Sequence, residues 1–183
     1  GTTTVSKPSM VLRALQYLLR HGSDDGFATY AREDGIERYI GALPEQTAGW
    51  RGTHLCVTAA TTHALLLHGV FDDARVRSAI ATLRDAQSSD GLWTSYWWQG
   101  SAYATAQSLR ALAAAHQLSD SIWRCATNGL MRVQRSDGGF GDDEGPSHAF
   151  ATAMALTALM TRPDPVCDAA IDAAACWLLE AQR

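Results

Sequence analysis

The sequence predicts an all-α fold of tandem two-helix repeats, about eight helices in all, because one short pattern occurs twice at the spacing of a helical repeat. The segment QSSDGLW at 87–93 recurs as QRSDGGF at 134–140, 47 residues later. Each copy contains an Asp-Gly pair, which is typical of a tight turn after a helix. A period of this length indicates stacked helical units that share their core with their neighbours.

Three Ala-rich segments provide the second observation, because they carry the same residues in the same register. The residues that recur every 47 positions are Thr58, Thr105 and Thr152, and Leu65, Leu112 and Leu159. An amphipathic segment follows each Ala-rich one. A repeat therefore consists of an Ala-rich helix, an amphipathic helix and a Gly-containing connector.

The elements are expected in a simple order along the chain. Apolar residues at helical spacing predict a first helix over 8–20, which ends at His21-Gly22 before a turn at Asp25-Gly26. Ala-rich helices are predicted over 52–69, 101–118 and 147–162. Amphipathic helices, started by Asp or Ser caps, are predicted to end near 87 and 134, and the last one within 178–183.

The segment 27–51 is longer than the later connectors and is interpreted as an insertion into a single repeat domain spanning 1–183. It is rich in aromatic and charged residues, contains Pro44, and is expected to hold a short helix over 35–42. Long irregular insertions in compact domains are often functional. Both a ligand-contacting role and a purely structural role stay open for it.

Composition excludes several classes of function. The 183 residues are 46% hydrophobic and 19% charged, with a net charge of −4, so a nucleic-acid surface is not expected. No apolar run is long enough to span a bilayer, and the N-terminus lacks the apolar core of a signal peptide. Four scattered cysteines favour a reducing compartment. The protein is therefore expected to be cytoplasmic, without membrane insertion.

The repeats also distinguish two faces of the Ala-rich helices. Positions kept in every copy serve the fold, since the fold is all that every copy shares. His54, Ser101 and His148 share one register position on this kept face, and the two histidines are interpreted as core or capping residues. Positions about half a turn away vary between copies. These are Cys56/Tyr103/Phe150, Ala60/Gln107/Met154 and His63/Arg110/Thr157. The varied face is either solvent-exposed or the lining of a shared cavity.

The pattern Gln-x-x-x-Gly-x-Trp at Gln87, Gly91 and Trp93 resembles the repeat motif of terpene cyclases of the squalene–hopene type. Thr-x-x-x-Leu-x-x-Leu, beginning at Thr152, is similar to the inner helices of protein prenyltransferase β subunits. The resemblance covers about 11–183 and implies a partial α/α toroid whose inner helices line a cavity. It also implies that Gln87, Trp93, Gln134 and Phe140 tie neighbouring repeats together.

The departures from these families limit what carries over. The Asp-x-Asp-Asp motif by which class II cyclases protonate is absent from the sequence, as is the Asp-Asp-x-x-Asp metal motif. The zinc-ligand His of prenyltransferases would fall at Ala151, so neither zinc nor another cofactor is expected. A full ring in these families has about twelve helices. The ring here is open, smaller or completed in a homo- or hetero-oligomer.

Candidate site residues come mainly from the varied face. Trp97 and Trp98 with Tyr103 form an aromatic group that suits a cation, or else a packed loop. Arg110 suits an anionic substrate group, or else reaches solvent. The catalytic candidates are His63, Tyr103, Asp142 and Asp143. The substrate-binding candidates are Arg51, Trp97, Trp98, Gln107, Arg110 and Phe150. Asp142 and Asp143 also fit a solvated turn before a helix.

These residues favour a small-molecule biosynthetic enzyme that promotes cyclisation or elimination as an anionic group (diphosphate, phosphate or sulfate) departs. Its partner is then a small molecule with an anionic group. The alternative is a non-catalytic subunit that completes a toroid with another chain.

Overall fold

The computed structural model describes residues 7–142 and 145–182, and within them the predicted all-α architecture is confirmed. The elements in chain order are α1 (Lys7–Arg20), β1 (Gly22–Ser23), β2 (Gly26–Phe27), the 3-10 turn η1 (Arg32–Asp34), α2 (Ile36–Ile40), α3 (Pro44–Thr47), η2 (Ala48–Arg51), α4 (Leu55–Leu67), α5 (Ala74–Asp85), α6 (Ala102–Ala114), α7 (Asp120–Val133), α8 (Ala149–Leu159), η3 (Pro165–Cys167) and α9 (Asp168–Glu180). The only sheet in these residues is the two-residue antiparallel pair β1–β2. The helix ends lie within a few residues of those predicted.

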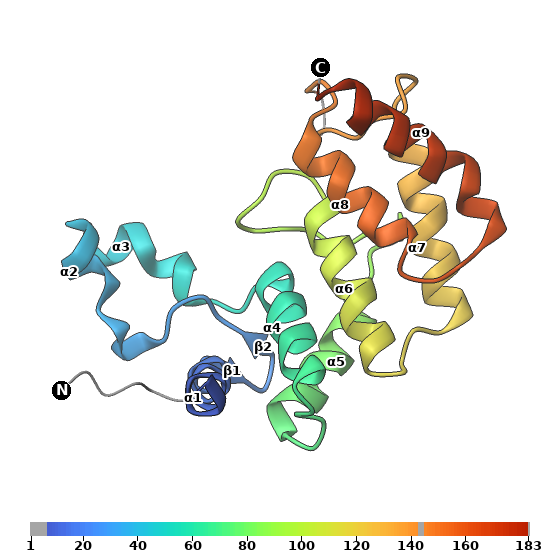
Figure 1. Cartoon of the computed structure of the whole chain (residues 1–183). Coiled ribbons are helices and arrows are strands. Elements are labelled where there is room, and N and C mark those ends of the chain that lie inside the picture. The colour runs from blue at the N-terminus through green and yellow to red at the C-terminus, as the bar shows by residue number, and fades with distance from the viewer. Residues whose placement is uncertain (1–6, 143–144, 183) are drawn as a thin grey trace.

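The helices form two layers (Figure 1). The Ala-rich helices α4, α6 and α8 lie side by side, and α5, α7 and α9 each pack against the inner helix of their own repeat. The small Ala side chains let the inner helices approach one another closely. The first helix, α1, packs on α4 at the N-terminal end of the row.

The face predicted to serve packing is buried. Thr58, Thr105 and Thr152 are at most 1% exposed, and the Leu residues of the same register are fully buried. The outer helix α7 shows why its pattern is amphipathic: Trp123, Ala126 and Leu130 face the core and its other side faces solvent. The prediction drawn from kept and varied positions is confirmed for the kept face.

The repeated QxxxGxW-type segments join successive repeats, as the resemblance implied. The Gln87 side-chain amide donates to the carbonyl of Gly91 at 2.8 Å and to that of Ile122 in the next outer helix at 3.0 Å. Gln134 does the same with Gly138 and Ala170, both at 2.9 Å. One amide thus fixes its own turn and the following repeat together.

Each connector is also tied to an inner helix. The backbone N–H of Trp93 donates to Oγ1 of Thr105 at 3.1 Å, and that of Phe140 donates to Thr152 at 2.9 Å. These bonds explain why Thr is kept at that register. The indole N–H of Trp93 donates in addition to the Leu83 carbonyl at 2.7 Å.

The first connector follows the same rule with one residue fewer. Here Phe27 donates its N–H to Thr58 at 2.9 Å and so occupies the place of Trp93. Phe27 directly follows Gly26, whereas one residue separates Gly91 from Trp93. The first connector is therefore one residue shorter between its glycine and its aromatic residue than the later ones, and the β1–β2 hairpin forms at this turn.

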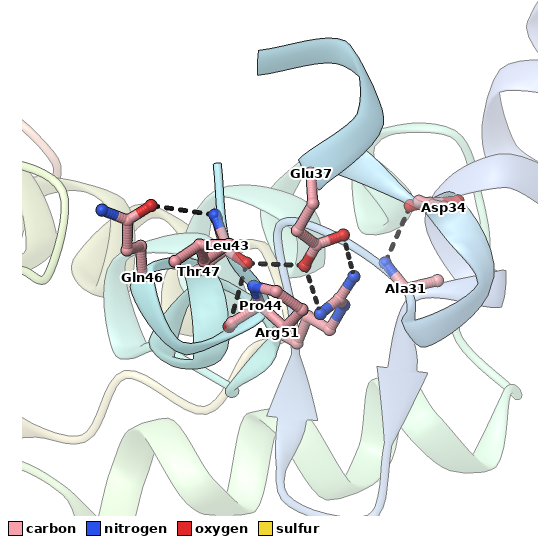
Figure 2. A network of polar contacts seen from close by, with 8 residues as sticks. All are labelled: Ala31, Asp34, Glu37, Leu43, Pro44, Gln46, Thr47 and Arg51. Carbon is pink, nitrogen blue, oxygen red and sulfur yellow. Dashed lines mark hydrogen bonds and ion pairs between the residues drawn. The ribbon is translucent and has the colours of Figure 1, made fainter. Parts of the chain in front are cut away.

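The insertion has more structure than predicted and stands away from the helical rows (Figure 1). The expected short helix is present as α2, but α3 and two 3-10 turns were not anticipated. Figure 2 shows its polar network, in which the carboxylate of Glu37 accepts hydrogen bonds from Thr47 and Arg51, both at 2.6 Å. His21 at the end of α1 holds Asp34 at 2.9 Å, which anchors the insertion to the first helix.

Candidate functional site

The varied face of the inner helices lines a series of cavities. On α6, Tyr103, Gln107 and Arg110 follow one another at intervals of four and three residues, so they lie on one side of the helix. Tyr103 and Arg110 are two turns apart, a rise of roughly 10 Å. Of the two readings left open for this face, solvent and cavity lining, cavities lie at both of its ends, and these two ends differ in chemistry.

The first end is aromatic. A cavity of about 470 Å³ is lined by Thr29, Tyr30, Cys56, Val57, Ala60, Thr61, Trp97, Trp98 and Tyr103. The ring centroids of Trp98 and Phe150 are 4.6 Å apart, and those of Trp98 and Tyr103 are 5.5 Å apart. Three predicted substrate-binding or catalytic residues therefore form one group of rings from α6, α8 and the connector before α6.

The insertion completes the wall of this cavity. Tyr30 lies 5.9 Å from Trp50, and Trp50 lies 5.4 Å from Trp97, centroid to centroid. The indole N–H of Trp97 donates to Oγ1 of Thr29 at 2.8 Å. Tyr30 and Trp50 were not among the predicted site residues. The high aromatic content of this long connector indicates in the sequence that its rings are packed. It does not indicate which residues they pack against.

Burial changes the acidity of the Tyr103 hydroxyl. The apolar surroundings raise its pKa, and the nearby Cys56 thiol acts in the same direction, whereas the positive charge of Arg110 acts against both. The hydroxyl therefore stays protonated at neutral pH. It can donate a hydrogen bond or present its ring face, rather than act as a base.

The second end is polar. A cavity of about 650 Å³ is lined by His63, Arg110, Ala113, Ala114, Thr157, Met160 and Thr161. It brings together the three varied positions of one register: His63, Arg110 and Thr157. Arg110 is half-buried and forms no hydrogen bond or ion pair with any described residue, so its guanidinium is available to an anion.

The same charge acts on His63. Burial lowers the pKa of this imidazole, and the positive charge of Arg110 lowers it further. A neutral imidazole is therefore favoured beside the cation at physiological pH. It can accept a proton or a hydrogen bond from a bound molecule.

Arg51 has a different environment from the one its predicted role requires. Its guanidinium forms a close two-point contact with the Glu37 carboxylate, which is 14% exposed. The hydrogen bonds from Arg51 and then Thr47 lower the pKa of Glu37 to about 2. Arg51 is thus already paired with an acid inside the insertion.

The acidic loop before α8 is described only in part. Asp142 lines a cavity of about 360 Å³ together with Trp97, Trp98, Gln99, His148 and Phe150. Asp143 lies outside the described residues. His148 caps α8, because its Nδ1 accepts the backbone N–H of Ala151 at 3.3 Å, and the prediction of a capping histidine is confirmed. His54 instead donates from Nε2 to the Gly49 carbonyl at 2.7 Å.

None of the helices in the described part of the chain combines the length and apolarity that crossing a bilayer requires.

Comparisons with known proteins agree with this architecture. The profile of the squalene-hopene cyclase C-terminal domain family matches residues 2–182. The chain is 34% identical over 121 residues to copalyl diphosphate synthase of Streptomyces cyslabdanicus, a match that covers 61% of this chain and 21% of that protein.

Solved structures give the same result. A variant of the type II terpene cyclase MstE from Scytonema, in complex with its substrate geranylgeranyl dihydroxybenzoate, is 34% identical with a TM-score of 0.77, covering 97% of this chain and 50% of that one. A protein from Actinoplanes is 30% identical with a TM-score of 0.74, covering 92% and 49% respectively. The chain thus spans about half the length of these solved relatives.

Proposed function

The chain belongs to the squalene-hopene cyclase C-terminal domain family, and we propose that it forms one wall of a terpenoid cyclase cavity that binds a prenyl chain bearing an anionic group. The observation that carries this proposal is the division of the varied face of the inner helices, called the concave face from here on, into an aromatic end at Tyr103 and a cationic end at Arg110. A substrate with a hydrocarbon chain and an anionic head is complementary to both ends at once.

The aromatic end suits the hydrocarbon and any positive charge that develops on it. The ring faces of Trp97, Trp98 and Tyr103 border an apolar cavity, and Phe150 adjoins them. Each ring carries negative potential on its face, and a desolvated cation over such a face gains about 2 kcal/mol. Apolar walls also exclude the water that would capture a carbocation.

The cationic end suits the head group. Arg110 presents donors in a fixed fork to a diphosphate, phosphate, sulfate or carboxylate. Thr157 and neutral His63 add hydrogen-bonding capacity beside it. Two roles follow for this head group. It leaves during the reaction, as proposed from the sequence, or it stays attached and only anchors the substrate.

We place the group that starts the reaction outside these 183 residues. The Asp-x-Asp-Asp motif is absent from the sequence, and the chain spans about half of its solved relatives. A further helical unit would then cover the open side of the concave face. The substrate bound to MstE supports a geranylgeranyl chain, and the name of copalyl diphosphate synthase supports a diphosphate head group, for the first compound to test.

The test is equilibrium binding by calorimetry to the full chain. Geranylgeranyl diphosphate is compared with geranylgeraniol, which has the same hydrocarbon and no charge. Arg110→Gln is expected to weaken binding of the diphosphate at least about tenfold, since a hydrogen bond to a charged group contributes about 1.5–3 kcal/mol. The same variant should leave geranylgeraniol binding unchanged, whereas Trp98→Ala should weaken both.

The matched control is Arg84→Gln, which removes an exposed arginine from the outer helix α5. It should change neither affinity. Unchanged diphosphate binding by Arg110→Gln would exclude Arg110 as the anion site. If the wild-type chain binds neither compound, the proposal that this cavity binds a prenyl chain fails. Mass spectrometry of bound material after incubation shows whether the diphosphate is retained or lost.

A further inference from the structure

The carboxylate of Asp142 and the imidazole of His148 meet at the aromatic end of the concave face. Oδ1 of Asp142 lies 3.2 Å from Nε2 of His148, and both residues line the cavity bordered by Trp97, Trp98 and Phe150. We propose that Asp142 is the proton acceptor that ends the cyclisation, and that His148 is its positioning residue. This inference rests on the proposed function and names a further step at the same site.

The hydrogen bonding of His148 determines which ring nitrogen carries the proton. Nδ1 accepts the backbone N–H of Ala151, so a neutral ring has its proton on Nε2. Nε2 is shielded from solvent and has no aligned hydrogen-bond acceptor among the described residues. Asp142 Oδ1, at 3.2 Å, becomes that acceptor after a small rotation of its carboxylate. His148 therefore occupies Oδ1 and leaves Oδ2 to take a proton.

The equivalent positions of the other repeats are used differently. His54 and Ser101 stand at the register of His148, and Ser95 stands at that of Asp142. His54 directs its Nε2–H to the Gly49 carbonyl, and Ser101 forms no side-chain cap. The fold therefore requires neither a carboxylate at Ser95 nor a comparable contact at His54 or Ser101, and it does not explain the pairing of Asp142 with His148. The pairing is particular to this repeat.

Two neighbours contact Asp142 itself. Arg135, after the end of α7, donates from its guanidinium to the backbone carbonyl of Asp142 at 2.7 Å. Gly100 lies against the carboxylate on the other side, since a Cβ at that position would be 3.3 Å from Oδ1. Among the described residues, the charged or titratable groups that contact Asp142 are thus His148, the N-cap residue of α8, and Arg135, which follows α7.

The chemistry of the step is a single proton transfer. A C–H bond next to the cationic carbon breaks, and its electron pair becomes the π bond of an alkene. The proton forms an O–H bond with Oδ2 of Asp142, which becomes a neutral carboxylic acid and later returns the proton to water. His148 keeps its own proton throughout, so its role is to orient the carboxylate.

The test uses three probes that share the farnesyl chain and differ at its end: farnesol, farnesyltrimethylammonium and farnesyldimethylammonium. The two cations both gain from the aromatic rings, but only the dimethyl compound has an N–H to donate. Wild type is expected to bind it about tenfold more tightly than the trimethyl compound, the gain typical of a hydrogen bond between charged groups. Asp142→Asn should abolish this preference and leave farnesol binding unchanged.

Two variants of His148 separate orientation from helix capping. His148→Ser keeps a side-chain acceptor for the Ala151 N–H but loses the Nε2–H, whereas His148→Ala loses both. If His148 positions the carboxylate, both variants lose the preference for the dimethyl compound, although only Ala lowers the melting temperature. A His148→Ser chain with the full wild-type preference would exclude the positioning role. Retention of the preference in Asp142→Asn would overturn the proposal, while failure of wild type to bind farnesol would count against the proposed function itself.

Discussion

The two faces of the inner helices follow opposite rules. On the packing face, Thr58, Thr105 and Thr152 repeat without change, and the latter two each accept a backbone N–H from the connector that precedes their helix. On the concave face, the register that holds His63 in one repeat holds Arg110 in the next. A residue bound to backbone is the same in every copy because the backbone is the same. A residue that lines a cavity is free to differ between copies, because it makes no backbone contact that every copy must repeat.

The largest effect is expected where a connector touches the next repeat. Gly91 has φ +87°, and a Cβ there would be 2.0 Å from the Cys125 carbonyl oxygen. Gly91→Ala is therefore expected to cost about 3–5 kcal/mol, from left-handed strain plus displacement of a packed helix. Gly69→Ala is the control, since φ is +79° but no atom lies within 4 Å; it should cost about 1–2 kcal/mol. Urea unfolding measures both, and equal costs would show that the close approach is unimportant.

A smaller loss of stability is expected from the packing threonine. Thr105→Val leaves the shape of the side chain but removes the acceptor for the buried Trp93 N–H, at a cost of about 1–3 kcal/mol. Thr157→Val makes the same change on the concave face, where the hydroxyl bonds only to its own helix at Ala153; it should cost about 0.5 kcal/mol or less. If the two variants unfold at the same urea concentration, the distinction between the faces fails.

A concave-face variant should change ionisation without changing stability at neutral pH. Arg110→Gln removes one of the two causes that lower the pKa of His63, so that pKa should rise toward its ordinary value while the contribution of burial remains. Because the folded-state pKa is lowered, the unfolded state binds the proton first, and stability is lost as pH falls below about 6.5. Arg110→Gln should therefore lose less stability than the wild type over this pH range. NMR titration of His63 gives the pKa, and no change would show that the Arg110 charge does not act there.

The smallest effect on global stability is expected in the insertion, which belongs to neither face. The folded-state pKa of Glu37 is about 2, so its contribution is present above the ordinary value near 4.5 and lost as pH falls toward 2. Glu37→Gln should loosen residues 36–51 at neutral pH while α6 keeps its protection from hydrogen exchange. Glu45→Gln, on the exposed first turn of α3, is the control. Equal exchange in both variants would mean that the Arg51 contact does not hold the insertion.

Periodicity was sufficient for the packing half of the molecule. The 47-residue spacing identified the helices and the buried Thr and Leu positions, because each depends on geometry that every copy repeats. The joining role of Gln87 and Gln134 came from the resemblance to terpene cyclases. The same spacing placed Tyr103, Arg110 and Phe150 on the varied face. The comparison of copies did not detect that the first connector is one residue shorter, because this connector lacks the Gln that marks the start of the motif.

The local structure of the insertion and the partners of the charged residues depended on tertiary contacts. Arg51 and Arg110 look alike in the sequence, yet one meets Glu37 and the other meets no described acid. Tyr30 lines the cavity, and Trp50 packs between Tyr30 and Trp97, only because the insertion contacts the connector that carries Trp97.

The sequence by itself thus determined the repeat, its length and its packing face, because these follow from local helix geometry copied along the chain. Only the tertiary structure decided which side chains share a cavity. Pairs such as Asp142 with His148, or His63 with Arg110, form between segments whose relative placement no local pattern encodes. Charge pairing and burial arise from these tertiary contacts, so the chemistry of the concave face depends on how the repeats pack together.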